Sequence, residues 1–444
     1  MSRRHYKRDF SSFFLFVFIM LMIGGLVYTY MTYKNIGISE ITDMFTIEKK
    51  DKEEKEIINY EITDDYESDK DVIEKVFMSG MDTEDYKKLF EQKTNYIEKN
   101  DKYKKIDYNF DKKLHYSELE SIYKNMNNSD IANVEIIGKS VDNRNMYGIE
   151  IGKGDRVLFM DANIHAAEVS TTLILTKFLS DILNNYDNGD KTIVDLLNNV
   201  KIAVIPCMNP DGYEVYNYGI ESLNNKDLWL YKNRKSISFE YSKSNANGVD
   251  LNRNFPTQHE GMYYKGNNLI SNTSLELTTS KSKYFNGYSG GSEPETKASM
   301  YFMLKHYKNT YAYINVHSQG RVLYAGKPNL SKEFNDLTQS FAKKVSKING
   351  YTVHGLSSEE VGEGNDGSAT DFMAELANGF IFSTKTGRLS SDKYKNNSCE
   401  LKYKYPVITM EITRTWTSDP SIFKTEYYDY GLKKLFYKLI EENF

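Results

Sequence analysis

The sequence predicts an α/β domain with a central mixed, largely parallel twisted sheet flanked by helices. Short apolar runs of the kind that form buried strands recur between residues 134 and 412. Segments whose apolar residues follow helical spacing lie between several of these runs. Strands that alternate with helices favour a sheet whose neighbouring strands run mostly parallel, with helices packed on its faces.

The composition agrees with a folded domain and argues against two classes of protein. The chain has 444 residues, of which 40% are hydrophobic and 27% charged, so it can bury a sizeable core. Its net charge of −5, without a clustered basic excess, argues against a nucleic-acid partner. The two cysteines, Cys207 and Cys399, are too few for a disulfide-scaffolded secreted domain.

The N-terminus is typical of a membrane anchor. Residues 1–9 form a basic tail, and residues 10–33 contain no charge and are long enough for a helix to span about 30 Å of hydrocarbon. Positive charge is retained in the cytoplasm, so we expect a single-pass protein of the cell membrane with the rest of the chain extracytoplasmic. A cleaved signal peptide is the alternative. The apolar stretch is longer than the usual core of about 7–15 residues, and it lacks small residues at its exit.

Residues 34–113 are predicted to form a charged stalk, helical or disordered. They are rich in Lys, Asp and Glu, and residues 48–56 are charged without interruption. Such a run cannot bury itself and stays in solvent. The composition changes near Leu114, so residues 114–444 are predicted to form the folded domain.

Within this domain, individual elements can be assigned from their apolar patterns. We expect strands at 134–138, 146–151, 157–162, 201–207, 311–316 and 407–412, and helices at 116–126, 169–184 and 331–348. The segment 260–291, rich in Asn, Ser, Thr, Tyr and Gly, predicts a long surface loop. Asn209–Gly212 is most simply a turn. Ser292–Glu295 matches a capping box that opens a helix ending near His306.

One pair of residues points to metal chemistry. His165 and Glu168 lie three apart, just after the third predicted strand and at the start of an apolar helix, so they can converge on one ion. Imidazole and carboxylate are zinc ligands, and catalytic zinc sites use three protein ligands with one open position. His-x-x-Glu alone recurs by chance, so a third ligand must come from another strand end. His317 directly follows an apolar strand and can supply it; otherwise it is a hydrogen-bonded core histidine.

Two further features carry polar groups into apolar surroundings. Asn252 and Arg253 lie beside a short apolar segment, where a guanidinium would suit a carboxylate or an oxyanion. Glu411 lies inside an apolar strand, and a carboxylate there is costly unless it is paired or functional.

The blocks HAAE, NPDG, GVDLNRNFP, GGSEPET, VHSQG and PVITMEI, in this order, resemble the successive blocks of the zinc carboxypeptidase family. The resemblance runs from about Leu114 to the C-terminus. It implies one Zn²⁺ per chain, bound by His165, Glu168 and His317. It also implies a metallopeptidase in which metal-activated water cleaves a peptide bond with Glu411 as general base and acid. Asn252 and Arg253 would hold the substrate's carboxylate or polarise the scissile carbonyl.

The sequence departs from the digestive members of that family. Their oxyanion Arg follows a Trp, whereas here Leu230 follows Trp229, so this Arg is missing or displaced to Arg234. The Tyr that closes over the substrate has no counterpart near residues 371–374. His-Ser-Gln-Gly at 317–320, with Tyr324 downstream, is similar to the corresponding motif of a bacterial branch of the family. Members of that branch cleave γ-D-glutamyl–diamino acid bonds in peptidoglycan stem peptides. An outward-facing, tethered enzyme would meet that substrate directly.

Two alternatives remain open. A membrane-tethered metallocarboxypeptidase acting on the C-termini of ordinary peptides would use the same catalytic residues, and only its products would distinguish it. A catalytically inactive relative that binds the cell wall would normally have lost a ligand or the Glu, and a metal assay would identify it.

Overall fold

The structure is a computed structural model, and it describes residues of the larger of two compact units, Tyr66–Phe444. The described residues are 93–232, 243–257, 262–265, 268–271, 287, 290–327, 330–355, 367–383, 388–390 and 401–441. The predicted basic tail, membrane anchor and most of the stalk lie outside these residues, as does Arg234. In the part of the chain that is described, no helix has the length and apolarity to cross a membrane.

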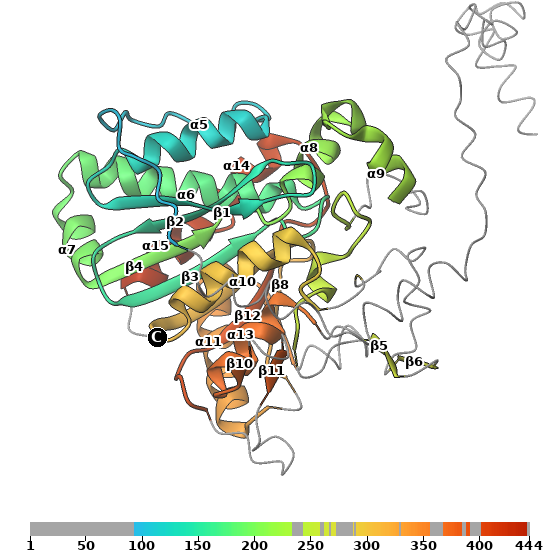
Figure 1. The fold of residues 1–444 in the computed structure, drawn as a ribbon. Coiled ribbons are helices and arrows are strands. Elements are labelled where there is room, and N and C mark those ends of the chain that lie inside the picture. Colours follow the sequence, from blue (N-terminus) through green and yellow to red (C-terminus); the bar gives the residue numbers. More distant parts are fainter. Residues whose placement is uncertain are drawn as a thin grey trace, which may run out of the picture. The chain divides into compact units, whose positions relative to one another are not determined.

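An eight-stranded mixed sheet forms the centre of the domain (Figure 1), in the order β1-β2-β4-β3-β7-β12-β8-β9. The strands are β1 (Ala132–Lys139), β2 (Asn145–Ile151), β3 (Arg156–Ala162), β4 (Val200–Ile205), β7 (Thr310–Ser318), β8 (Val322–Ala325), β9 (Thr352–His354) and β12 (Val407–Ile412). The four central strands β4, β3, β7 and β12 are parallel, whereas β1, β2 and β8 pair antiparallel at the margins. The predicted mixed, largely parallel sheet is therefore confirmed.

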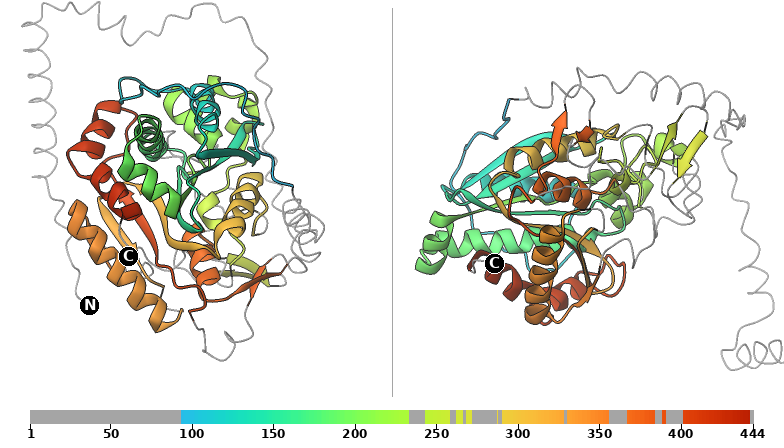
Figure 2. Two further views of the ribbon diagram at one scale, coloured as in Figure 1. Left: turned by 90° about the vertical axis from the view of Figure 1, so that its left-hand side faces the viewer. Right: turned by 90° about the horizontal axis from the view of Figure 1, so that it is seen from below.

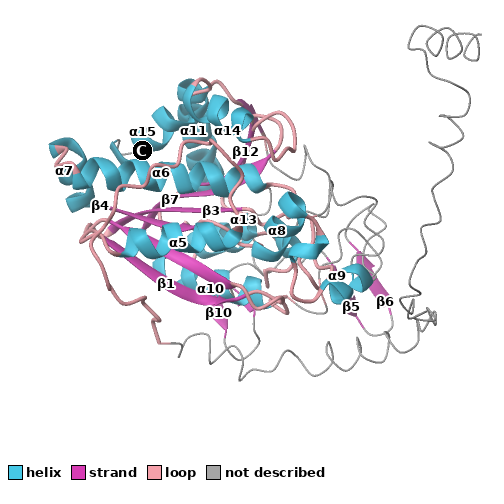
Figure 3. Cartoon of the chain, turned by 90° about the horizontal axis from the view of Figure 1, so that it is seen from above, coloured by secondary structure: helices cyan, strands magenta, loops and turns pink. Residues whose placement is uncertain are grey.

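Helices cover both faces of this sheet. They are α5 (Tyr116–Asn127), α6 (Val169–Asp187), α7 (Lys191–Asn199), α8 (Pro210–Tyr218), α9 (Lys226–Lys232), α10 (Pro294–His306), α11 (Lys332–Asn349), α13 (Ala369–Ala377), α14 (Pro420–Tyr428) and α15 (Leu432–Glu441). One face packs against α5, α6, α14 and α15, and the other against α10 and α13. Figure 2 shows α11 (orange) beside α14 and α15 (red), and in Figure 3 α5 lies along β1.

The alternation of side chains along β3 explains why its sequence is apolar throughout. Leu158 and Met160 belong to the core under α6, while Val157 and Phe159 belong to the core under α10. Successive strand residues point to opposite faces, so a strand covered on both sides needs apolar residues at every position.

Three local predictions are corrected by the structure. Asn209–Gly212 opens helix α8 rather than forming a simple turn, because the Asn209 side chain accepts a hydrogen bond from Gly212 N (2.9 Å) and Pro210 occupies the first helical position. The predicted loop at 260–291 contains a hairpin of β5 (Met262–Lys265) and β6 (Asn268–Ser271). Helix α10 ends at His306 as expected, but its N-cap is Glu293 without a side-chain cap, since Ser292 Oγ donates to the Glu293 carboxylate (2.8 Å) instead.

The folded domain also begins earlier than residue 114. Ile106, Tyr108 and Phe110 are buried in the main core, and Ile97 N donates to Val134 O (2.9 Å) at the edge of the sheet. These three side chains alternate with charged or polar residues, so one side of an extended segment can be buried while the other stays in solvent. The last part of the predicted stalk is thus packed against the domain.

A buried ionic contact joins α14 to the β8 end of the sheet. Glu426 is fully buried, and Arg321 Nη2 and Nε lie 2.7 and 3.0 Å from its Oε2. The Tyr351 hydroxyl donates to the other carboxylate oxygen. Both oxygens of this buried carboxylate therefore have hydrogen-bond partners.

We expect Glu426→Ala to lower the free energy of unfolding by about 3–5 kcal/mol, because it leaves the Arg321 guanidinium without its buried partner. Asp336→Ala is the matched control: it breaks the exposed pair with Lys332, whose side chain is 87% exposed. That change should cost less than about 1 kcal/mol. Urea denaturation of the purified proteins measures both, and equal losses would contradict this assignment.

Candidate metal centre and active site

The turn after β3 carries two of the expected ligands. His165 lies three residues beyond the strand, and Glu168 is the N-cap residue of α6. Asn163 adopts a positive φ of 53°, and its side-chain amide donates to His165 O (2.7 Å). Thr171 Oγ1 donates to Glu168 O (2.7 Å) and accepts from Asn163 N (2.9 Å). These bonds fix the turn, so both side chains are oriented before any ligand binds.

The third expected ligand comes from the neighbouring strand. His317 lies at the end of β7, which is parallel to β3, so both strands deliver their polar residues to the same edge of the sheet. The chain leaves β3 for β4 on one side and later returns as β7 on the other. This reversal of strand order is where ligands bind in open α/β sheets.

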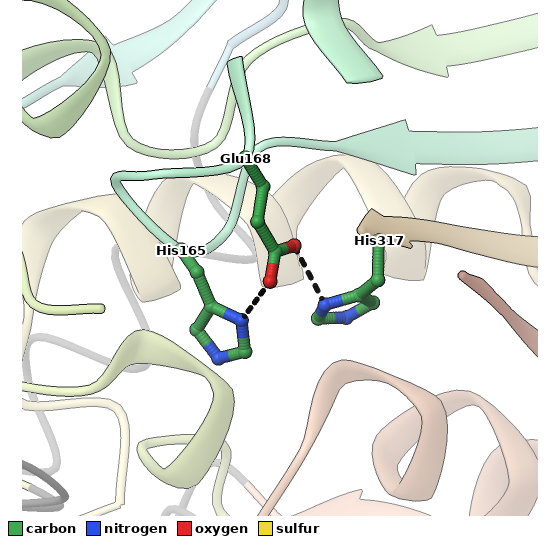
Figure 4. A group of neighbouring side chains, drawn as sticks. All are labelled: His165, Glu168 and His317. Atoms are coloured by element: carbon green, nitrogen blue, oxygen red, sulfur yellow. Dashed lines mark hydrogen bonds and ion pairs between the residues drawn. The ribbon is translucent and has the colours of Figure 1, made fainter. Parts of the chain in front are cut away.

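The three side chains point toward one another (Figure 4). His165 Nδ1 lies 2.8 Å from Glu168 Oε1, and His317 Nδ1 lies 2.9 Å from Glu168 Oε2. One donor atom from each of the three residues lies within 4.8 Å of the other two. Two imidazole nitrogens and one carboxylate oxygen are a donor set that suits catalytic zinc. The residues present therefore fit the metal.

Burial and mutual charge set the ionisation of this cluster. Burial alone would raise the pKa of Glu168, but the two imidazoles hold it well below its usual value. Burial lowers the pKa of His317, which favours the neutral imidazole that a metal requires. Burial and the Lys243 charge lower the pKa of His165, but the carboxylates of Glu168 and Asp250 outweigh them and raise it.

Asp250 was not expected from the sequence. It is fully buried, and its Oδ1 lies 3.3 Å from His165 Nε2 while also accepting from Asn252 N (3.0 Å). A carboxylate on the outer nitrogen orients an imidazole and leaves the inner nitrogen for a metal. The same signal that singled out Glu411, an acidic residue inside an apolar run, was present here in Val249-Asp250-Leu251.

Glu411 lies beside the cluster. It is in register with His317 on the neighbouring strand β12, so the two side chains emerge on the same face. Burial raises the pKa of Glu411 well above its usual value, the nearby Glu168 charge raises it further, and Lys243 partly opposes this. Its Oε2 has no hydrogen-bond partner, and none of the ion pairs among the described residues includes it. Of the two alternatives that the sequence left for Glu411, paired or functional, these residues therefore favour the functional one.

The cluster opens into a cleft that is also lined by Asn252 and Arg253. Asn252 Oδ1 accepts from Ala369 N (3.1 Å), and Arg253 Nη1 donates to Asn252 O (2.8 Å). Gly367 has a positive φ of 80°, and a Cβ there would lie 2.8 Å from Arg253 O. These contacts tie the short helix Leu251–Arg253 to the start of α13.

Lys243 is a second basic residue of this cleft that sequence reasoning missed. Its charge acts on His165, His317, Glu411 and Asp250, and that of Arg253 acts on Asp250 as well. The segment that follows it is held by Asn245, whose amide donates to Glu293 (2.8 Å) and Glu295 (3.0 Å). Burial and the neighbouring acids raise the pKa of Glu295 to about 8. The Ser-Glu-Pro-Glu motif is therefore structural, as expected, but it supports the cleft rather than capping a helix.

Comparison with known proteins identifies relatives of this arrangement. The sequence model of the family described as zinc carboxypeptidase matches residues 119–418. Gamma-D-glutamyl-L-diamino acid endopeptidase 1 of Lysinibacillus sphaericus is 31% identical over 225 residues, which are 48% of this chain and 52% of that protein. Carboxypeptidase O of Bos taurus is 26% identical over 264 residues, 57% of this chain and 64% of that protein. The chain thus spans between half and two thirds of the length of these relatives.

A solved structure shares the fold. Bovine thrombin-activatable fibrinolysis inhibitor, in complex with tick carboxypeptidase inhibitor, superimposes with a TM-score of 0.52 at 19% identity. The superposition covers 75% of this chain and 99% of that one. At this identity the likeness establishes the α/β architecture and nothing finer.

We expect the purified protein to carry one zinc per chain, and His165→Ala, Glu168→Ala and His317→Ala each to lose most of it, because each removes a donor atom. Asp250→Asn should weaken zinc binding by about 10–100-fold, since it perturbs only the orientation of His165. His115→Ala, at the half-exposed N-cap residue of α5, is the control and should retain full stoichiometry. Elemental analysis and competition with a chelator measure both quantities. Full zinc content in the His317→Ala protein would contradict this ligand set.

Proposed function

The chain belongs to the zinc carboxypeptidase family, and we propose that this metallopeptidase cleaves the γ-D-glutamyl–diamino acid bond of peptidoglycan stem peptides. The observation that carries the proposal is the 31% identity to an endopeptidase named for that bond. The family has zinc metallopeptidase activity, so the inactive cell-wall-binding relative considered above is set aside.

In the proposed mechanism, His165, Glu168 and His317 would hold a zinc ion, which would supply Lewis-acid chemistry to the scissile carbonyl and to a water molecule. Glu411 takes the proton from the attacking water and returns it to the leaving amine. Its unpartnered Oε2 and its apolar strand suit this role, because a buried carboxylate without a fixed donor is free to accept a proton.

Two basic side chains would stabilise the developing charge and bind the substrate. Lys243, whose charge reaches both histidines and Glu411, would stabilise the negative charge that develops on the carbonyl oxygen. Arg253 lies at the α13 side of the cleft and would bind a substrate carboxylate through its planar fork. In this proposal Lys243 takes the part for which the sequence had offered Arg234.

The location of the enzyme is part of the same proposal. Residues 10–33 are uncharged and follow a basic tail, which supports a single membrane-spanning helix with the catalytic domain outside. A peptidase placed there would meet the cell wall directly.

The second candidate is a membrane-tethered carboxypeptidase that trims ordinary peptides. The 26% identity to carboxypeptidase O of Bos taurus supports it, and it would use the same catalytic residues. The two functions differ in the bond that is cut, so only the products separate them.

Digestion of purified muropeptides should release products cut between D-glutamate and the diamino acid, detected by mass spectrometry. A panel of ordinary peptides with free C-termini serves as the comparison, and we expect it to be cleaved much more slowly. Rapid removal of single C-terminal residues from that panel, with intact muropeptides, would favour the second candidate.

Glu411→Gln should lower kcat by about 10²–10⁴-fold while zinc content stays unchanged, because the amide keeps the shape but cannot accept the proton. The thermal midpoint should stay the same or rise, since a buried carboxylate is replaced by a neutral group. Glu98→Gln, an exposed site away from the cleft, controls for the substitution itself. A clear loss of stability with retained activity would mean that Glu411 has a structural role instead.

A further inference from the structure

The cleft has a second end, away from the metal centre. Glu411, Thr409 and Val407 alternate along β12 and all line the cleft. At about 3.3 Å per residue, Thr409 lies about 7 Å and Val407 about 13 Å along the strand from Glu411. We call the region beyond Glu411 the far end; its lining residues are Lys327, Phe334, Thr370, Ala374, Val407 and Thr409. A substrate side chain that points away from the scissile bond along β12 would enter it.

An ion pair lies at the far end, and its ammonium faces the cleft. Lys327 Nζ forms an ion pair with Asp371 Oδ1, and Asp371 Oδ2 accepts from Ser368 N (3.1 Å). The Lys327 side chain is 17% exposed and that of Asp371 only 7%, so the ammonium is the member of the pair that faces the cleft. An ammonium has three donors, and the contact with Asp371 uses one of them. Asp371 also lies in the first turn of α13, where the helix dipole compensates part of its charge.

The backbone of Lys327 is fixed as well. Lys327 N donates to Asn335 Oδ1 (2.7 Å), and Asn335 Nδ2 donates back to Lys327 O (2.9 Å). Asn335 belongs to the first turns of α11, so a helix holds this lysine in place. A charge positioned in this way loses little entropy when it binds a ligand.

The walls between the metal centre and Lys327 are of mixed character. Phe334, Ala374 and Val407 offer apolar surface to a methylene chain. Thr370 Oγ1 and Thr409 Oγ1 lie 3.1 Å apart and add hydroxyl groups on one side. This pattern suits a long aliphatic side chain with a carboxylate at its tip.

We propose that the far end selects a substrate residue whose side chain ends in a carboxylate, and that Lys327 binds that carboxylate. The inference rests on the proposed function and narrows it. Diaminopimelate carries a carboxylate at the end of its side chain, whereas lysine is the same diamino acid without it. The enzyme should therefore act on stem peptides that contain diaminopimelate and discriminate against those that contain lysine.

The test uses two pairs of substrates. In each pair, one member has a side-chain carboxylate that the other member lacks. The first pair is γ-D-glutamyl-diaminopimelate and γ-D-glutamyl-lysine stem peptides. The second is an ordinary acylated peptide ending in α-aminoadipate or in norleucine. We expect kcat/KM to favour the carboxylate member by about 10–100-fold, as for one charge-assisted hydrogen bond. Calorimetric binding of free diaminopimelate and free lysine to the zinc-loaded protein makes the same comparison without turnover.

In the Lys327→Met protein the preference should disappear, with the rate on the carboxylate member falling to that of the member without the carboxylate. Lys327→Arg should retain a preference, and Lys327→Glu should reverse it toward lysine. Because Lys327→Met leaves Asp371 without its partner, the double variant Lys327→Met, Asp371→Asn is measured alongside it. Zinc content and the urea midpoint report whether each variant is folded.

The inference would be overturned if the preference survived in both Lys327→Met and the double variant. It would also be overturned if the wild-type protein did not distinguish the members of either pair in rate or binding. Failure of the proposed function has a different result. If only the ordinary peptides are cleaved, the bond assignment is wrong, yet α-aminoadipate against norleucine still tests Lys327.

Discussion

The Glu168 carboxylate between two imidazoles is the interaction on which the rest of the site depends. All three groups are buried, and burial of an isolated charge is strongly unfavourable, so they are tolerable only in contact with one another or with a metal. Their convergence requires β3 and β7 to be parallel neighbours, since only then do the turn after β3 and the end of β7 meet at one edge. The apolar strands and the helices on both faces of the sheet hold these three side chains in position.

The roles that we assign to the surrounding groups follow from their positions around that cluster. Asp250 holds the outer nitrogen of His165, and Glu411 emerges beside His317 from the next parallel strand. The two basic residues Lys243 and Arg253 come from segments tied to the sheet by polar side chains rather than by regular structure. Beyond Glu411 the cleft contains Lys327, to which we assign the selection of substrate. In this proposal, chemistry and specificity occupy successive positions along one strand.

Much of this was predictable from the sequence, for physical reasons. His165, Glu168, His317 and Glu411 each follow or interrupt an apolar strand, and the order of parallel strands brings strand ends together. Lys243 and Lys327 were not found, because they lie in irregular segments that are held by hydrogen bonds to other elements. Asp250 was missed although Val249-Asp250-Leu251 carries the same signal as Glu411. The helix at Pro210 was misread since Asn-Pro-Asp-Gly is compatible with both a turn and a capped helix start. The packing of residues 93–113 was hidden by their charged composition.

The most direct test of this account is a crystal structure of the protein with anomalous diffraction recorded at the zinc absorption edge. The account predicts one strong peak, within bonding distance of Nδ1 of His165, Nδ1 of His317 and the carboxylate of Glu168, with His165 Nε2 still facing Asp250. A peak bound through the Nε2 atoms, or a zinc site that does not include Glu168, would contradict it.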